Sequence, residues 1–132
     1  KKLEKDNKIY FDLIENVSHE EALHRKSKSD IFIDQIGDKG GWGYGMNSVE
    51  SLSMGICTLT ELNSKYQKFI PDYPFINVNK ITLKDTLNDL INNEKRILDA
   101  GLKAKKWVNE KHNVRKVADQ LYNYYRGIGL NV

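Results

Sequence analysis

The chain has 132 residues, with 21 Lys and Arg against 18 Asp and Glu and a formal net charge of +3. This length predicts one domain spanning residues 1–132, and so mild a positive charge does not indicate nucleic acid as a partner. No apolar run approaches the ~18 residues needed to span a bilayer, no signal peptide is recognisable, and a single cysteine excludes an internal disulfide. The first residue is not methionine, which suggests a processed product or a piece of a longer chain.

The N-terminal part predicts a strand followed by a helix. Residues 9–14, IYFDLI, have the aromatic and β-branched content of a strand. A helix is then expected to open at Ser18, which forms a capping-box pattern with Glu21. Its charged residues predict a mostly solvated face: Glu20, Glu21, His24, Arg25, Lys26 and Lys28. His19 and His24 lack a further pair of ligands at suitable spacing, so we expect no metal site.

The stretch 30–60 organises the rest of the chain. An apolar run, Ile31–Ile33, ends in Asp34 and Gln35, and a glycine-rich loop follows. A helix is predicted from about residue 47 to 54, with a stop at Gly55 and a second apolar run over 56–60. Strand, loop, helix and strand in this order predict a βαβ unit, in which ligands bind at the carboxyl ends of the strands.

The loop has two interpretations on spacing alone. Five glycines fall within nine positions, at 37, 40, 41, 43 and 45, and a helix N-terminus follows them. Such an end favours an anion, most often a phosphate, yet neither common phosphate-loop pattern is present. On spacing alone, a flexible connection between two elements is the favoured interpretation of these glycines. Asn47 and Glu50 would likewise be explained as N-cap and N3 of a capping box that needs no ligand.

The remainder predicts one more strand and several helices. Residues 61–74 contain a short helix closed by prolines, 75–78 form a strand, and helices open at Thr82, after the Asn92–Asn93 break and at Asn113. Three aromatic residues form either a base-stacking wall or, as is usual, part of the core: Tyr66, Tyr73 and Phe75. Cys57 lies in an apolar strand and is predicted to be a buried filler rather than a nucleophile. The elements together predict an α/β, Rossmann-like three-layer fold with a mainly parallel sheet of about four strands and a helical C-terminal tail.

The segment from Gly43 to Ile56, GYGMNSVESLSMGI, resembles the donor-site signature of retaining, group 1 glycosyltransferases of the GT-B fold. That signature reads roughly Glu-x-Phe-Gly-x-x-x-x-Glu-Ala-x-Ala-x-Gly-x-Pro. Tyr44 and Gly45 match its Phe-Gly pair, Glu50 its second glutamate, and Gly55 the glycine before the next strand. A weaker likeness extends over nearly the whole chain. The resemblance implies a partial C-terminal, nucleotide-sugar-binding domain of such an enzyme.

The resemblance also implies roles for individual residues. Backbone amides around Gly45, Met46 and Asn47 would hold the diphosphate of a nucleotide sugar, and Glu50 would accept hydrogen bonds from the ribose hydroxyls. The loop from Gly41 to Tyr44, with Trp42 and Gly43, would lie close to the transferred sugar. Gln35, which ends the first strand of the unit, completes the expected substrate-binding set.

This chain departs from the family in one position and lacks some of its parts. A carboxylate is expected eight residues before Glu50, where this chain has Trp42; an indole stacks on a sugar but accepts no hydroxyl protons. Asp38 is a possible substitute. The family's basic residues that neutralise the leaving diphosphate, and its acceptor domain, are not recognisable here.

We therefore expect the donor-binding part of a glycosyltransferase that is inactive alone and uses no cofactor or metal. Its partners would be a nucleoside-diphosphate sugar and, through the missing domain, an acceptor sugar or other hydroxyl compound. A cytoplasmic location is expected, with peripheral association of the full enzyme at the inner membrane face as an option. The alternative is a non-catalytic, flavodoxin- or receiver-like interaction module, although Asp34 alone is a poor match to the acidic cluster of receivers.

Overall fold

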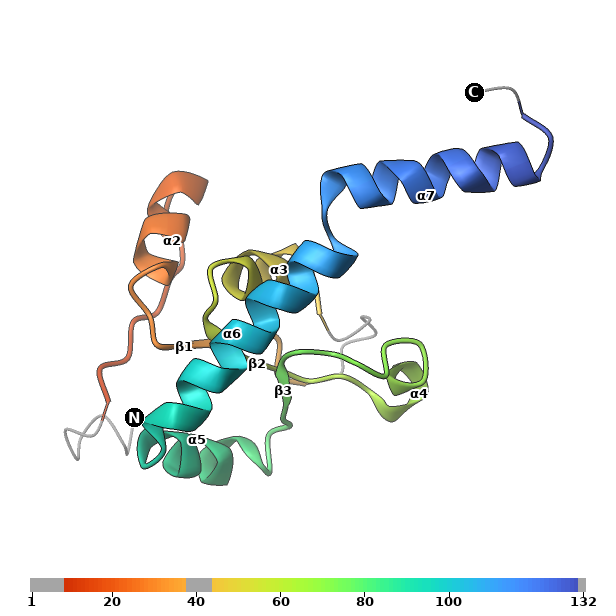
Figure 1. Cartoon of the computed structure of the whole chain (residues 1–132). Coiled ribbons are helices and arrows are strands. Elements are labelled where there is room, and N and C mark those ends of the chain that lie inside the picture. The colour runs from red at the N-terminus through yellow and green to blue at the C-terminus, as the bar shows by residue number, and fades with distance from the viewer. Residues whose placement is uncertain (1–8, 38–43, 131–132) are drawn as a thin grey trace.

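The computed structural model describes residues 9–37 and 44–130 as an α/β fold built on a parallel sheet (Figure 1). The elements, in chain order, are α2 (His19–Lys26), β1 (Ile31–Ile33), α3 (Met46–Ser53), β2 (Cys57–Thr60), α4 (Ser64–Gln67), β3 (Ile76–Asn77), α5 (Leu83–Ile91), α6 (Glu94–Lys111) and α7 (Val114–Gly127). The predicted fold class is confirmed. The described residues form three strands rather than about four.

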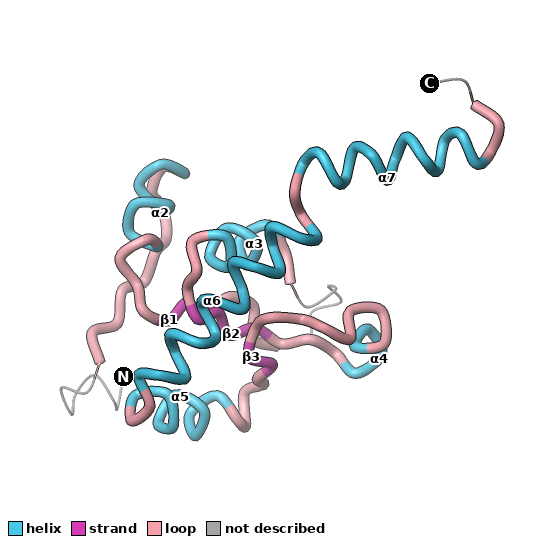
Figure 2. The backbone as a smooth tube through the Cα atoms, viewed as in Figure 1, coloured by secondary structure: helices cyan, strands magenta, loops and turns pink. Residues whose placement is uncertain are grey.

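The sheet has the order β1-β2-β3, and both pairings are parallel. In β1 and β2, Ile31 stands opposite Cys57 and Ile33 opposite Leu59; in β2 and β3, Leu59 stands opposite Ile76. Figure 2 shows the short strands together near the centre, with helices around them. Parallel strands joined through α3 place residues 34–37, which follow β1, and the start of α3 at the carboxyl edge of the sheet, as predicted for a βαβ unit.

Helices cover both faces of the sheet because side chains alternate along each strand. The side chains of Cys57 and Leu59 pack with Val78, Leu90 of α5 and the first turns of α6. The intervening Thr58 points to α3, where its hydroxyl lies 2.8 Å from the Ser51 hydroxyl. A second buried cluster lies under α3 and the middle of α6 and consists of Leu52, Leu62, Phe75 and Ala104. Figure 1 shows α3 above the strands and α5 below them.

The turn between α3 and β2 is held closely by α6. Gly55 has a φ of +79°, and the amides of Gly55 and Ile56 donate to the carbonyls of Leu52 and Ser51. This is a Schellman ending, so the predicted stop at Gly55 is confirmed. Gly101 of α6 packs directly on it: a Cβ at position 101 would stand 2.0 Å from the carbonyl oxygen of Gly55. Only glycine allows the two backbones to approach this far.

The predicted strand at residues 9–14 is wrong. The structure gives this segment no regular secondary structure, and the Tyr10 side chain is 90% exposed. A strand needs a neighbouring edge for its backbone groups, and here the segment is held instead by a side chain: Arg25 of α2 donates through Nε to Asp12 at 2.9 Å. Composition alone cannot supply that missing partner.

The predicted helix starts are mostly confirmed. The first turns of α2, α6 and α7 donate hydrogen bonds to the side chains of Ser18, Asn93 and Asn113. Asn63, for which no start was predicted, caps α4 in the same way. Thr82 stands at the start of α5 but makes no cap bond; its hydroxyl accepts from the amide of Asn79 instead. α7 continues away from the sheet after a break near His112, and none of its residues is buried (Figure 1).

Candidate functional site

The candidate site lies where α3 begins, at the carboxyl edge of the sheet. Gly45 is the N-cap residue, with an extended φ of −123°, and no side chain makes a cap bond. The first amide with a helical bond is that of Val49, which donates to the Gly45 carbonyl at 3.1 Å. The amides of Met46, Asn47 and Ser48 therefore have no carbonyl within the helix to bond, as at any helix start. They present donors and the positive end of the helix dipole to an anion.

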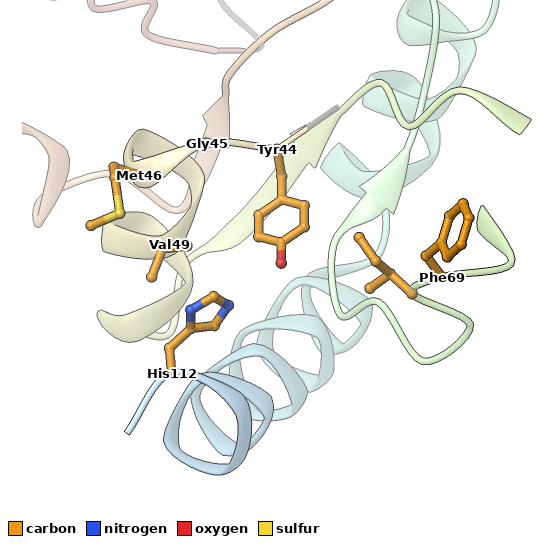
Figure 3. Close-up of a pocket in the computed structure, with 7 residues that line it drawn as sticks. Tyr44, Gly45, Met46, Val49, Phe69 and His112 are labelled. Atoms are coloured by element: carbon orange, nitrogen blue, oxygen red, sulfur yellow. The ribbon is translucent and has the colours of Figure 1, made fainter. Parts of the chain in front are cut away.

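A groove of about 360 Å³ lies beside this helix end (Figure 3). Its walls are formed by Tyr44, Gly45, Met46, Val49, Phe69, Ile70 and His112. In Figure 3, Met46 and Val49 of α3 lie on one side and Phe69 on the other, with Tyr44 and His112 between them. Three predicted residues line it, the consecutive Tyr44, Gly45 and Met46, and the fold brings Phe69, Ile70 and His112 to them around one mainly apolar hollow. The predicted residues Glu50 and Gln35 are not among its lining residues.

Two groove residues have pKa values shifted by burial. Burial raises the pKa of the Tyr44 hydroxyl, with the nearby Asp72 carboxylate adding to the shift. Burial lowers the pKa of His112, so the neutral imidazole is favoured in the folded chain. The rings of Tyr44 and His112 meet edge to face at a centroid distance of 6.1 Å. No local sequence pattern indicated His112, which follows α6 and reaches the groove only through the tertiary fold.

Glu50 lies one turn into α3 and is held by a buried lysine. Its Oε2 stands 2.6 Å from Nζ of Lys26, the last residue of α2, which is only 2% exposed. Its Oε1 stands 3.6 Å from Nε2 of the exposed His19. The prediction that Lys26 belongs to a solvated face is wrong. Lys26 follows Ala22 and Leu23 by four and three residues, and this spacing places it on the face of α2 that packs inward.

The capping-box interpretation of Asn47 and Glu50 is also wrong. α3 begins at Met46, so Asn47 is the second helical residue, and Glu50 lies beyond the first turn. The Asn47 side chain instead accepts from Lys26 Nζ at 2.6 Å through Oδ1 and donates through Nδ2 to Asp34 at 3.0 Å. The other carboxylate oxygen of Asp34 accepts a hydrogen bond from the Ser48 hydroxyl. Asp34 therefore ties the end of β1 to the start of α3.

The other predicted residues divide into three groups. Gln35 is exposed after β1, and its backbone carbonyl accepts from the amide of Glu61 at 2.9 Å. Trp42 and Gly43, with Asp38, lie outside the described residues. Cys57 is buried, and burial raises the pKa of its thiol to about 11, so it is a filler as predicted.

The aromatic residues considered for base stacking belong to the core. Phe75 is buried, and Tyr66 and Tyr73 pack against the same cluster. The rings of Tyr73 and Phe75 stack on each other at 4.8 Å. The usual interpretation of such residues is therefore confirmed, and the groove takes its aromatic walls from Tyr44 and Phe69 instead.

Within residues 9–37 and 44–130, no three His, Cys, Asp or Glu side chains gather to hold a metal ion. In the same part of the chain, no helix has the length and hydropathy of a membrane span.

Comparison with known proteins identifies no family for this chain. No protein-family model matches the chain, and neither a curated protein nor a solved structure shows significant similarity to it.

Proposed function

We propose that this chain is the donor-binding part of a glycosyltransferase that uses a nucleoside-diphosphate sugar. The observation that carries the proposal is the placement of two features on one short helix at the carboxyl edge of the sheet. The uncapped first turn of α3 is one, and the Glu50 carboxylate one turn further along is the other. Together they repeat the order that the sequence resemblance assigns to the diphosphate and ribose contacts.

The start of α3 supplies the proposed diphosphate contact. The amides of Met46, Asn47 and Ser48 point toward the end of the helix, and Gly45 has no Cβ to shield them. An anion at such an end gains typically 0.3–1 kcal/mol from the helix dipole, and each charged hydrogen bond contributes about 1.5–3 kcal/mol.

Glu50 supplies the proposed ribose contact. Its side chain is 25% exposed, so a ligand can reach it. Oε2 is bonded to Lys26, while the contact of Oε1 with His19, at 3.6 Å, is longer than a hydrogen bond. Oε1 therefore keeps its acceptor capacity for the vicinal hydroxyls of a ribose.

The groove provides room for the rest of the donor. Met46 and Val49 of α3 line it together with Tyr44 and Gly45, so a diphosphate at the start of the helix would lie next to the groove. We place the transferred sugar toward the groove, next to Tyr44. Its mainly apolar walls suit the C–H faces of a sugar ring.

The catalytic step needs more than these residues. A departing nucleoside diphosphate requires positive charge where negative charge develops, and Lys26 is already paired with Glu50. We therefore expect this chain to bind the donor weakly and to transfer no sugar alone. Reaction with an acceptor hydroxyl, and any peripheral contact of the whole enzyme with a membrane, would depend on further parts.

Calorimetric titration of the full chain with UDP, GDP and ADP tests the proposal. At least one should bind, and Glu50→Gln should weaken that binding about tenfold or more, from the 1.5–3 kcal/mol of a hydrogen bond to a charged group. Glutamine is the suitable substitution because its amide oxygen still accepts from Lys26. Absence of binding by all three nucleotides at millimolar concentration would contradict the proposal and favour a non-catalytic interaction module.

A further inference from the structure

The buried ammonium of Lys26 meets an unusually complete set of partners. Its Nζ lies 2.6 Å from Oε2 of Glu50, 2.6 Å from Oδ1 of Asn47 and 3.5 Å from the Asn47 carbonyl oxygen. The ring of Phe32 in β1 lies 4.9 Å away, centroid to Nζ. A lysine ammonium has three protons to donate, and here three acceptors stand around it with an aromatic face nearby.

This arrangement fixes the Glu50 side chain in one orientation. Lys26 is 2% exposed, so its head group has no room to follow a moving carboxylate. Asn47, the second anchor, is itself held by its bond to Asp34 at the end of β1. Glu50 is thereby tied through Lys26 and Asn47 to the edge of the sheet rather than left to rotate in solvent.

The orientation leaves one carboxylate oxygen for a ligand. Oε2 faces the buried lysine, whereas Oε1 faces His19, whose side chain is 72% exposed. A glutamate at the same position without Lys26 would be free to turn either oxygen, or neither, toward a bound ribose. Preorganised acceptors bind more tightly because less side-chain freedom is lost on binding.

A purely stabilising role explains these contacts less well. Replacing a buried ion pair by apolar residues of similar size is often neutral or stabilising, so the pair by itself is weak evidence for stability. Its distinctive effect is on geometry, since one charge at the end of α2 sets the direction of a carboxylate on α3.

We propose that Lys26 is a positioning residue that aims Glu50 at the ribose hydroxyls of the nucleotide, an inference that rests on the proposed donor-binding function. Lys26 does not touch the ligand in this arrangement. Lys26 therefore affects nucleotide affinity only through Glu50, and the effect shows as the preference for a nucleotide with both ribose hydroxyls over one without them.

The test compares the dissociation constants of the full chain for the nucleoside diphosphate that binds and for its 2′,3′-dideoxy counterpart. The unaltered chain should prefer the ribonucleotide about tenfold or more. Lys26→Met should lower this ratio toward one while binding of the dideoxy compound changes less than threefold. Lys26→Arg should restore part of the preference. Lys28→Met is the matched control, because Lys28 is exposed two residues further along and should leave the ratio unchanged.

Each outcome separates this inference from the function on which it rests. If the unaltered chain prefers the ribonucleotide and Lys26→Met prefers it by the same ratio, the positioning role is overturned and the donor-binding proposal stands. Equal losses for both nucleotides in Lys26→Met would also overturn it. If neither nucleotide binds the unaltered chain, both proposals fail. Should Lys26→Met not fold, the same comparison with Lys26→Gln decides the question, since glutamine keeps a hydrogen bond without the charge.

Discussion

Replacing Gly101 by alanine should destabilise the protein, although alanine is the better helix former. In an exposed helix interior this change stabilises by about 1 kcal/mol. In α6, however, the added Cβ would stand 2.0 Å from the Gly55 carbonyl oxygen, whereas Cβ contacts under 3.0 Å are essentially never observed. The helix or the turn must therefore move by at least about 1 Å.

The loss of stability caused by that movement depends on the buried side chains of α6. Ala104 and Trp107 are buried in the same helix, so its displacement loosens the packing around both. Overpacking of this kind costs typically 1–3 kcal/mol, and a clash with backbone belongs at the upper end. After the gain in helix propensity, we expect the free energy of unfolding to fall by roughly 2 kcal/mol.

Urea denaturation followed by circular dichroism measures this change. Gly127→Ala is the control, because no atom lies within 4 Å of a Cβ at position 127, and it should be neutral or slightly stabilising. If Gly101→Ala proves as stable as the unaltered chain or more so, the close contact between α6 and the turn that ends α3 does not exist as described.

Three further predictions concern side chains that the fold removes wholly or partly from water. Glu50→Ala should lower the free energy of unfolding by about 3 kcal/mol, because it leaves Lys26 buried without its counter-charge. Adding Lys26→Met should recover most of that loss in urea denaturation. If the effects of the two substitutions on the free energy of unfolding simply add, the coupling between the two side chains is contradicted. The Cys57 thiol, with its pKa raised to about 11, should react with a thiol reagent at pH 8 only as fast as the chain unfolds, so rapid labelling of the folded chain would refute its burial. Because partial desolvation against Tyr44 and Trp107 lowers the pKa of His112, the unfolded chain takes up the proton more readily, and stability should fall as the pH drops below about 6.5. His112→Gln should flatten this part of the pH profile, and an unchanged profile would show that these contacts do not desolvate the imidazole.

The βαβ unit was predictable because its signals are local. Apolar runs, the glycine-rich loop and Gly55 each act within a few residues of chain, and the structure places β1, α3 and β2 within a residue or two of the predicted bounds. The C-terminal helices were predictable for the same reason, since Asn93 and Asn113 cap them through their own next turns.

The predictions that were wrong or missing concern residues whose environment depends on contacts between distant segments of the chain. Residues 9–14 have the composition of a strand, but a strand exists only beside a partner, and the structure gives them Arg25 instead. The role of Lys26 was missed because a lysine in a charged helix is usually solvated, and only the packing of α2 on α3 shows that it is buried. His112 reaches the groove through the course of α6, which local sequence does not reveal.

The central claim is that the first amides of α3 bind the diphosphate of a nucleotide. The most direct test is an NMR titration of the ¹⁵N-labelled chain with UDP, GDP and ADP. We predict that at least one nucleotide shifts the amide resonances of Met46, Asn47 and Ser48 in a saturable way, with smaller changes in α7. If none of the three moves these resonances up to millimolar concentration, or if the shifts lie elsewhere in the chain, the claim is contradicted.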